Sequence, residues 1–144
     1  MYHRLFSARL DRKSIEDAIR RAEACTSGEI CVIIHEKPVA DAVSFAQGEF
    51  VRRGLDRTRH RNAVLFLVAP RSRTFAVIGD EGVHRRCGDP FWQEVAAAMA
   101  QDFRNGDFTM GLVNGITRAG DLLARHFPPD SENPNELPDQ VTVV

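Results

Sequence analysis

The 144-residue chain is poor in the features that mark secreted, membrane and metal-thiolate proteins. Its three cysteines, Cys25, Cys31 and Cys87, are odd in number and include no CxxC pair, which argues against a disulfide framework and a thiolate zinc site. No run approaches the ~20 apolar residues that a membrane span requires, and the N-terminus lacks the apolar stretch of a secretory signal. We therefore expect a cytoplasmic protein without a transmembrane segment.

Common catalytic and nucleic-acid-binding signatures are also missing. There is no GxSxG elbow, Walker loop or GxGxxG segment, and the five histidines show no HExxH spacing. The formal net charge is only −1, and residues 1–127 carry 19 basic against 16 acidic residues. This small excess is not a concentrated basic face, so we expect no nucleic-acid partner and assign no catalytic residue.

Composition and length instead indicate one globular domain. The chain is 43% hydrophobic and 27% charged, close to the globular average, and is long enough for one core. We expect a single α/β domain over residues 1–127. Residues 128–144 are rich in proline, with four acids and no base, and predict a disordered tail.

Apolar periodicity predicts alternating helices and strands in the first half of the chain. Residues 11–27 are typical of an amphipathic helix with Asp11 and Ser14 as possible caps, and residues 29–35 form a β-branched run typical of a buried strand. Pro38 is expected to open a second helix. Residues 63–69 are apolar at every position, which indicates a central strand covered on both faces.

The second half of the chain predicts a mixed sheet. Only four residues separate the central strand from residues 74–78, which suits a hairpin and therefore an antiparallel pair. Asp89 is expected to cap a further helix with Pro90 at its first position, and a final helix ends near Phe127. Gly111, Gly115 and Ala119 within that helix indicate close packing. The fold class is therefore an αβα sandwich with a small mixed β-sheet flanked by helices on both faces.

The segment Gly79-Asp80-Glu81-Gly82 is the most informative stretch for chemistry. Two adjacent carboxylates at the end of a strand suit a hard cation such as calcium or magnesium, and Asp89 lies close enough in sequence to add a ligand. Glu29 and Asp107 are more distant candidates for the same metal site. The alternative is a tight glycine turn with solvated acids.

A second stretch, residues 52–62, contains five arginines. Guanidinium groups bind phosphate bidentately, so Arg57 and Arg59, with Arg85 from beyond the acidic loop, are candidate anion-binding residues. The alternative is a solvated connection, since 17 of the 19 basic residues are arginine and a general bias toward arginine inflates such a cluster.

Five segments taken together resemble the TPM-domain family, in the same order and spacing, over about residues 11–128. They are Ala22-Glu23-Ala24-Cys25-Thr26-Ser27-Gly28-Glu29-Ile30, Thr58-Arg59-His60-Arg61-Asn62-Ala63-Val64-Leu65, Gly79-Asp80-Glu81-Gly82-Val83, Phe91-Trp92 and Phe127-Pro128. The chain looks like the short, soluble bacterial branch of that family. The resemblance implies an αβα sandwich and, in the plant thylakoid members, acid phosphatase activity with a calcium-binding acidic cluster.

The resemblance also bears on single residues. The family's glycine–x–glutamate–glycine segment matches Gly79, Glu81 and Gly82, which makes Glu81 the best-supported functional residue. This chain has Arg86 where many larger members carry an aspartate, and Ala63 where glycine is common. We therefore expect a module that binds calcium or magnesium and contacts a protein or membrane-complex partner. The alternative is a metal-dependent acid phosphatase, a phosphomonoester hydrolase.

Overall fold

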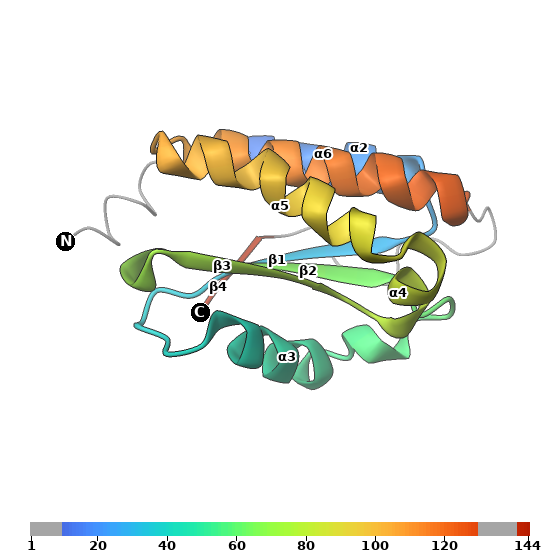
Figure 1. The fold of residues 1–144 in the computed structure, drawn as a ribbon, viewed down its shortest axis with the longest axis horizontal. Helices are drawn as coiled ribbons and strands as arrows, with labels where there is room; N and C mark the ends of the chain where they lie inside the picture. The colour runs from blue at the N-terminus through green and yellow to red at the C-terminus, as the bar shows by residue number, and fades with distance from the viewer. Residues whose placement is uncertain (1–9, 130–140) are drawn as a thin grey trace.

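The computed structural model describes residues 10–129 and 141–144. A four-stranded sheet lies between two helical layers (Figure 1). One face is covered by α2 (Arg12–Ala24), α5 (Asp89–Arg104) and α6 (Phe108–His126), and the other by α3 (Ala42–Arg52). This arrangement confirms the αβα sandwich. Within the described ranges, no helix is both long and apolar enough to cross a membrane.

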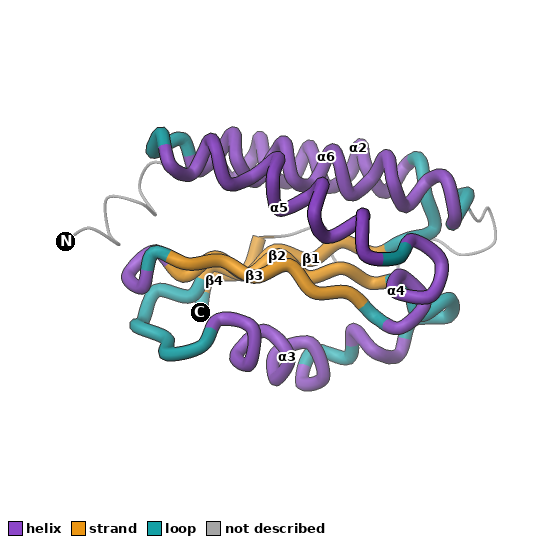
Figure 2. The backbone as a smooth tube through the Cα atoms, in the orientation of Figure 1, coloured by secondary structure: helices purple, strands orange, loops and turns teal. Residues whose placement is uncertain are grey.

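The sheet has the strand order β3-β2-β1-β4 and is mixed, as predicted (Figure 2). The two central strands, β1 (Glu29–Ile34) and β2 (Ala63–Ala69), are parallel. The hairpin turn Pro70–Ser72 then reverses the chain into β3 (Thr74–Gly79), which pairs with β2 antiparallel. All seven residues of β2 are buried, because helices cover both of its faces.

Alternation along β2 divides the core between the two faces. Val64 and Phe66 point toward α2, α5 and α6, whereas Leu65 and Leu67 point toward α3. The contact between α5 and α6 is close: a Cβ at Gly111 would lie 2.3 Å from the Phe103 ring. The small residues of α6 therefore permit helix packing, as the sequence predicts.

The last strand corrects the prediction for the tail. A disordered tail is expected from residue 128, but β4 (Val141–Val143) pairs in parallel with β1. The amide of Val141 donates to Glu16 and its carbonyl accepts from Arg12, so α2 holds the strand at both backbone groups. The β-branched sequence at the end of the chain is the signal for this strand. Residues 130–140 of the expected tail lie outside the described residues.

Two helices begin later or with a different cap than predicted. Pro38 does not open α3, because Asp41 caps it and accepts from the amides of Val43 and Ser44. At α5, Gly88 occupies the cap position with φ 74°, and Asp89 is the first helical residue. A left-handed φ is accessible to glycine without steric cost, which is why the cap lies one residue earlier.

Candidate functional site

The acidic loop forms the junction between β3 and α4 (Glu81–Cys87). Asp80 caps α4, and its Oδ1 accepts from the amide of Glu81 at 2.8 Å. The side chain is only 6% exposed. The amide of Gly82 donates to the carbonyl of Arg61 at 2.9 Å, and a Cβ at this position would lie 2.5 Å from that oxygen. Glycine at position 82 therefore permits the arginine-rich loop to lie against the start of α4.

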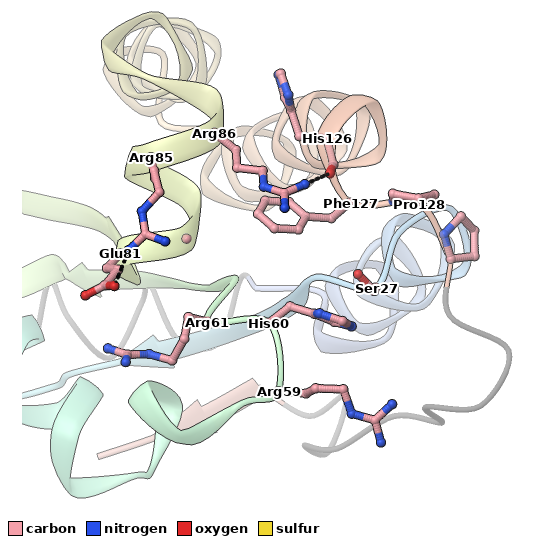
Figure 3. Close-up of a pocket in the computed structure, with 12 residues that line it drawn as sticks. Ser27, Arg59, His60, Arg61, Glu81, Arg85, Arg86, His126, Phe127 and Pro128 are labelled. Carbon is pink, nitrogen blue, oxygen red and sulfur yellow. Dashed lines mark hydrogen bonds and ion pairs between the residues drawn. The ribbon is translucent and has the colours of Figure 1, made fainter.

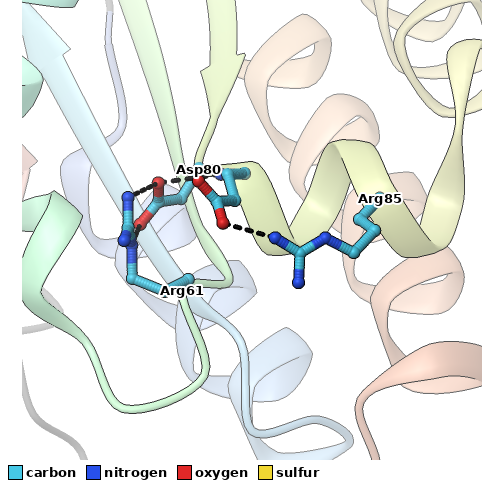
Figure 4. Close-up of polar contacts among 4 residues, drawn as sticks. Arg61, Asp80 and Arg85 are labelled. Carbon is cyan, nitrogen blue, oxygen red and sulfur yellow. Dashed lines mark hydrogen bonds and ion pairs between the residues drawn. The ribbon is translucent and has the colours of Figure 1, made fainter.

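Each acid of this loop is ion-paired with an arginine (Figure 4). Arg61 donates two hydrogen bonds to Asp80, from Nε to Oδ2 at 2.6 Å and from Nη2 to Oδ1 at 2.8 Å. These bonds and the charge of Asp80 raise the pKa of Arg61 above its ordinary value. Glu81, which is exposed, pairs with Arg85 one helical turn later. Asp80 is therefore a buried, ion-paired carboxylate, whereas the carboxylate of Glu81 stays in contact with solvent in a surface ion pair.

A hollow of about 650 Å³ opens beside this loop, at the amino ends of β1 and β2 (Figure 3). Its charged lining contains one carboxylate, Glu81, and four arginines, Arg59, Arg61, Arg85 and Arg86. The other lining residues are Ser27, His60, Gly82, His126, Phe127, Pro128 and Pro129. We call this space the arginine hollow. Its charge favours an anion over a cation.

Arg86 links the two sides of the arginine hollow. Its guanidinium lies over the ring of Phe127, 5.4 Å from the centroid, and Nη1 donates to the carbonyl of His126 at 3.3 Å. Figure 3 shows Arg86 extending from α4 toward the end of α6, while Arg85 turns to Glu81 and Arg59 extends at the opposite rim. The arginines thus surround the hollow without meeting at one point.

The anion-binding residues predicted from the sequence are partly brought together. Arg59 and Arg85 line the hollow, whereas Arg57, exposed in the short helix Leu55–Arg57, is not among its lining residues. Sequence reasoning did not select Arg61 or Arg86 as site residues. Arg61 lies in the arginine-rich loop and Arg86 follows Arg85. The proximity of each to other arginines in the sequence is the signal that could have identified them as site residues.

The five predicted metal ligands are more dispersed. Asp89 is exposed beyond α4, whose seven residues span about 10 Å, and Asp107 caps α6 beyond α5, whose 16 residues span about 24 Å. Glu29 is buried at the start of β1, two strands from Asp80 and therefore about 10 Å away between Cα atoms.

Only Asp80 and Glu81 of these five residues are neighbours. Within residues 10–129 and 141–144, no three histidine, cysteine, aspartate or glutamate side chains come together as a metal-binding group. At most two carboxylates, those of Asp80 and Glu81, could therefore ligate one cation here, and backbone carbonyls and water would have to supply the other oxygen ligands.

Comparisons with known proteins agree with this architecture. A model of the TPM domain matches residues 2–122. The solution structure of BA42 protein, from the psychrophilic bacterium Bizionia argentinensis, is 37% identical and superposes with a TM-score of 0.88, covering 94% of this chain and 96% of that one. No curated protein matched the chain.

Two more distant structures share the fold alone. The N-terminal domain of a protein from P. gingivalis has 18% identity and a TM-score of 0.64, covering 77% of this chain and 72% of that one. The N-terminal domain of cg2496 protein from Corynebacterium glutamicum has 17% identity and a TM-score of 0.62, covering 76% and 68%.

Proposed function

The chain belongs to the TPM-domain family, and we propose that it is a binding module whose arginine hollow captures an anionic group of a protein partner. The observation that carries the proposal is the arginine-rich lining, which holds four guanidinium groups and one carboxylate, with Asp80 paired to Arg61 next to it. Guanidinium groups donate in a planar fork that matches the oxygens of a phosphate or carboxylate. Arg86 is the primary contact proposed, because Arg61 and Arg85 already pair with Asp80 and Glu81.

The apolar side of the hollow supports a macromolecular ligand. Pro128 and Pro129 are exposed next to Arg86 and leave a surface for an uncharged part of the ligand, whereas Phe127 is buried with its ring against the Arg86 guanidinium. Small-molecule and peptide sites commonly combine such an apolar surface with a few oriented polar groups.

Calcium or magnesium binding, which the sequence and the family resemblance imply, requires a rearrangement of this site. The ion pair between Asp80 and Arg61 would have to break before Asp80 could ligate a cation, and the ion pair between Glu81 and Arg85 before Glu81 could do so. The metal-dependent phosphatase alternative needs the same change. An anion at Arg86 would displace no carboxylate, because that guanidinium donates to the carbonyl of His126, and for that reason we favour an anion.

The test is an amide-shift NMR titration of the chelator-treated protein with inorganic phosphate, then with calcium and magnesium. We expect phosphate to give saturable shifts in residues 59–61, 81–86 and 126–129. Loss of one charge-assisted contact in Arg86→Gln should weaken affinity by about tenfold. Arg71→Gln is the matched control, because Arg71 is an exposed arginine in the hairpin turn and does not line the hollow.

The same titration separates the alternatives. Saturable shifts with calcium or magnesium but not with phosphate, abolished by Glu81→Gln, would replace the anion proposal with a metal site. Hydrolysis of p-nitrophenyl phosphate that disappears in Glu81→Gln would establish the phosphatase. Retention of the fold in that variant, checked by circular dichroism, is the control.

A further inference from the structure

A second hollow, of about 430 Å³, lies at the opposite end of the molecule from the arginine hollow. It is bounded by the carboxyl end of β2, the hairpin turn, and the neighbouring ends of α5 and α6. Figure 1 shows the hairpin turn and the connection between α5 and α6 at the same end of the molecule, away from α4. In open α/β sheets, ligands commonly bind just outside the carboxyl ends of the strands.

Three phenylalanine rings form the interior of this space, which we call the phenylalanine hollow. Phe75 of β3 and Phe103 of α5 meet edge to face, with ring centroids 5.2 Å apart and ring planes at 83°. Phe108, the first residue of α6, lies 5.6 Å from Phe103 with the planes at 61°. All three rings pack against the main core and are only partly buried. An apolar ligand in this hollow would therefore contact aromatic rings.

The charge at the rim of the phenylalanine hollow is positive. Of the described residues that line it, only Arg73 in the hairpin turn and Arg104, the last residue of α5, are charged. Arg104 is exposed, and in the described part of the chain its guanidinium makes no hydrogen bond or ion pair. The acids nearest to Arg104 in the sequence do not line the hollow: Asp102 accepts from Asn114, and Asp107 caps α6.

We infer that the phenylalanine hollow binds an aromatic monocarboxylate. The ring of such a ligand packs among the phenylalanines, which already make edge-to-face contacts with one another, and its carboxylate binds the guanidinium of Arg104. Arg73 adds a second positive charge at the rim. The volume falls within the range of pockets that hold small ligands, which commonly combine an apolar lining with a few polar groups.

This site is separate from the proposed anion site, because the two hollows share no lining residue. The test is an amide-shift NMR titration of the full chain with 3-phenylpropionate. We expect saturable shifts in residues 68–75 and 100–108. Residues 59–61 and 81–86, which lie around the arginine hollow, should shift little, and saturating inorganic phosphate should not displace the ligand.

Two variants and a control test the position of the site. Arg104→Gln should weaken the affinity by about tenfold, because one charge-assisted contact is lost. Arg71→Gln is the control, because Arg71 is exposed in the hairpin turn and does not line the phenylalanine hollow. Ala100→Leu fills the hollow from α5 and should abolish the shifts, and leucine is nearly as good a helix former as alanine. Unchanged far-UV circular dichroism shows that each variant keeps the fold.

Two further probes test the chemistry of the ligand. The affinity for 3-phenylpropionamide, which lacks the charge, should be about tenfold lower, and hexanoate, which lacks the ring, should also bind more weakly. Equal affinity for the amide overturns the role of the arginines, and equal affinity for hexanoate overturns that of the rings.

Three outcomes of the titration overturn the inference as a whole. They are the absence of saturable shifts in residues 68–75 and 100–108, binding that Ala100→Leu leaves unchanged, and shifts confined to residues 59–61 and 81–86. The last outcome would assign the carboxylate to the arginine hollow and would leave the proposed function standing.

Discussion

Two glycines in helices should respond to alanine in opposite directions. Gly48, exposed in the middle of α3, has no atom within 4 Å of an added Cβ. Alanine there gains only helix propensity, which stabilises by about 1 kcal/mol. At Gly82 the same gain is opposed, because a Cβ would lie 2.5 Å from the carbonyl oxygen of Arg61 and 2.7 Å from that of His60.

The cost at Gly82 exceeds the gain. The opposing atoms are backbone, so the loop must move instead of a side chain rotating away, and overpacking of this kind costs about 1–3 kcal/mol. The hydrogen bond from the Gly82 amide to Arg61, 2.9 Å long, contributes about 1 kcal/mol more when it is lost. The higher helix propensity of alanine offsets about 1 kcal/mol of these costs. We therefore expect Gly82→Ala to lower the free energy of unfolding by about 1–3 kcal/mol in total.

Urea denaturation measures both variants in one experiment. The single tryptophan, Trp92, reports on the region near the acidic loop, and far-UV circular dichroism reports on the helices. Gly48→Ala should move the midpoint up and Gly82→Ala should move it down. If Gly82→Ala is as stable as Gly48→Ala, the loop at His60 and Arg61 can move away from the added Cβ without cost, and the proposed steric requirement is wrong.

The thiols and one helix cap give two further predictions. Burial raises the pKa of Cys31 to about 11, so at pH 8 a disulfide reagent should modify the exposed Cys25 first and reach Cys31 only on unfolding. Fast modification of two thiols, with Cys31 identified by mass spectrometry, would contradict this. Hydrogen bonds from Ser44 hold the pKa of Asp41 below its ordinary value, so its stabilising effect is complete above about pH 4 and is lost as the pH falls through the depressed pKa. Asp41→Asn should therefore flatten the acid side of the stability curve, and an unchanged curve would argue against the cap.

The fold was largely predictable because its main signals are local. The apolar run of β2 and the four residues that follow it determine a central strand and an antiparallel hairpin, whatever the rest of the chain does. The exact start of α3 was not predictable, because both Pro38 and Asp41 are acceptable helix beginnings. The side chain of Asp41, which accepts from two amides, decided between them. The three residues of β4 are too few for a periodicity argument.

The site was less predictable because its important contact joins residues 19 positions apart. The sequence shows two acids and several arginines, and it cannot show that Arg61, at φ 53°, is the one that reaches Asp80. That pairing changes the interpretation of the whole loop. Asp80 is buried and holds the arginine-rich loop against α4, so it acts as a positioning residue rather than as an open ligand.

The consequence is that the acidic and arginine-rich segments form one structure, not two independent sites. Gly82 permits the close approach of the loop, and Asp80 fixes Arg61 against α4. Glu81 balances Arg85, and Arg86 adds a positive charge to the lining of the hollow beside that pair. The aspartate common in larger family members would place a carboxylate where this chain has Arg86. The charge at position 86 is therefore the feature that the titration of Arg86→Gln with phosphate tests.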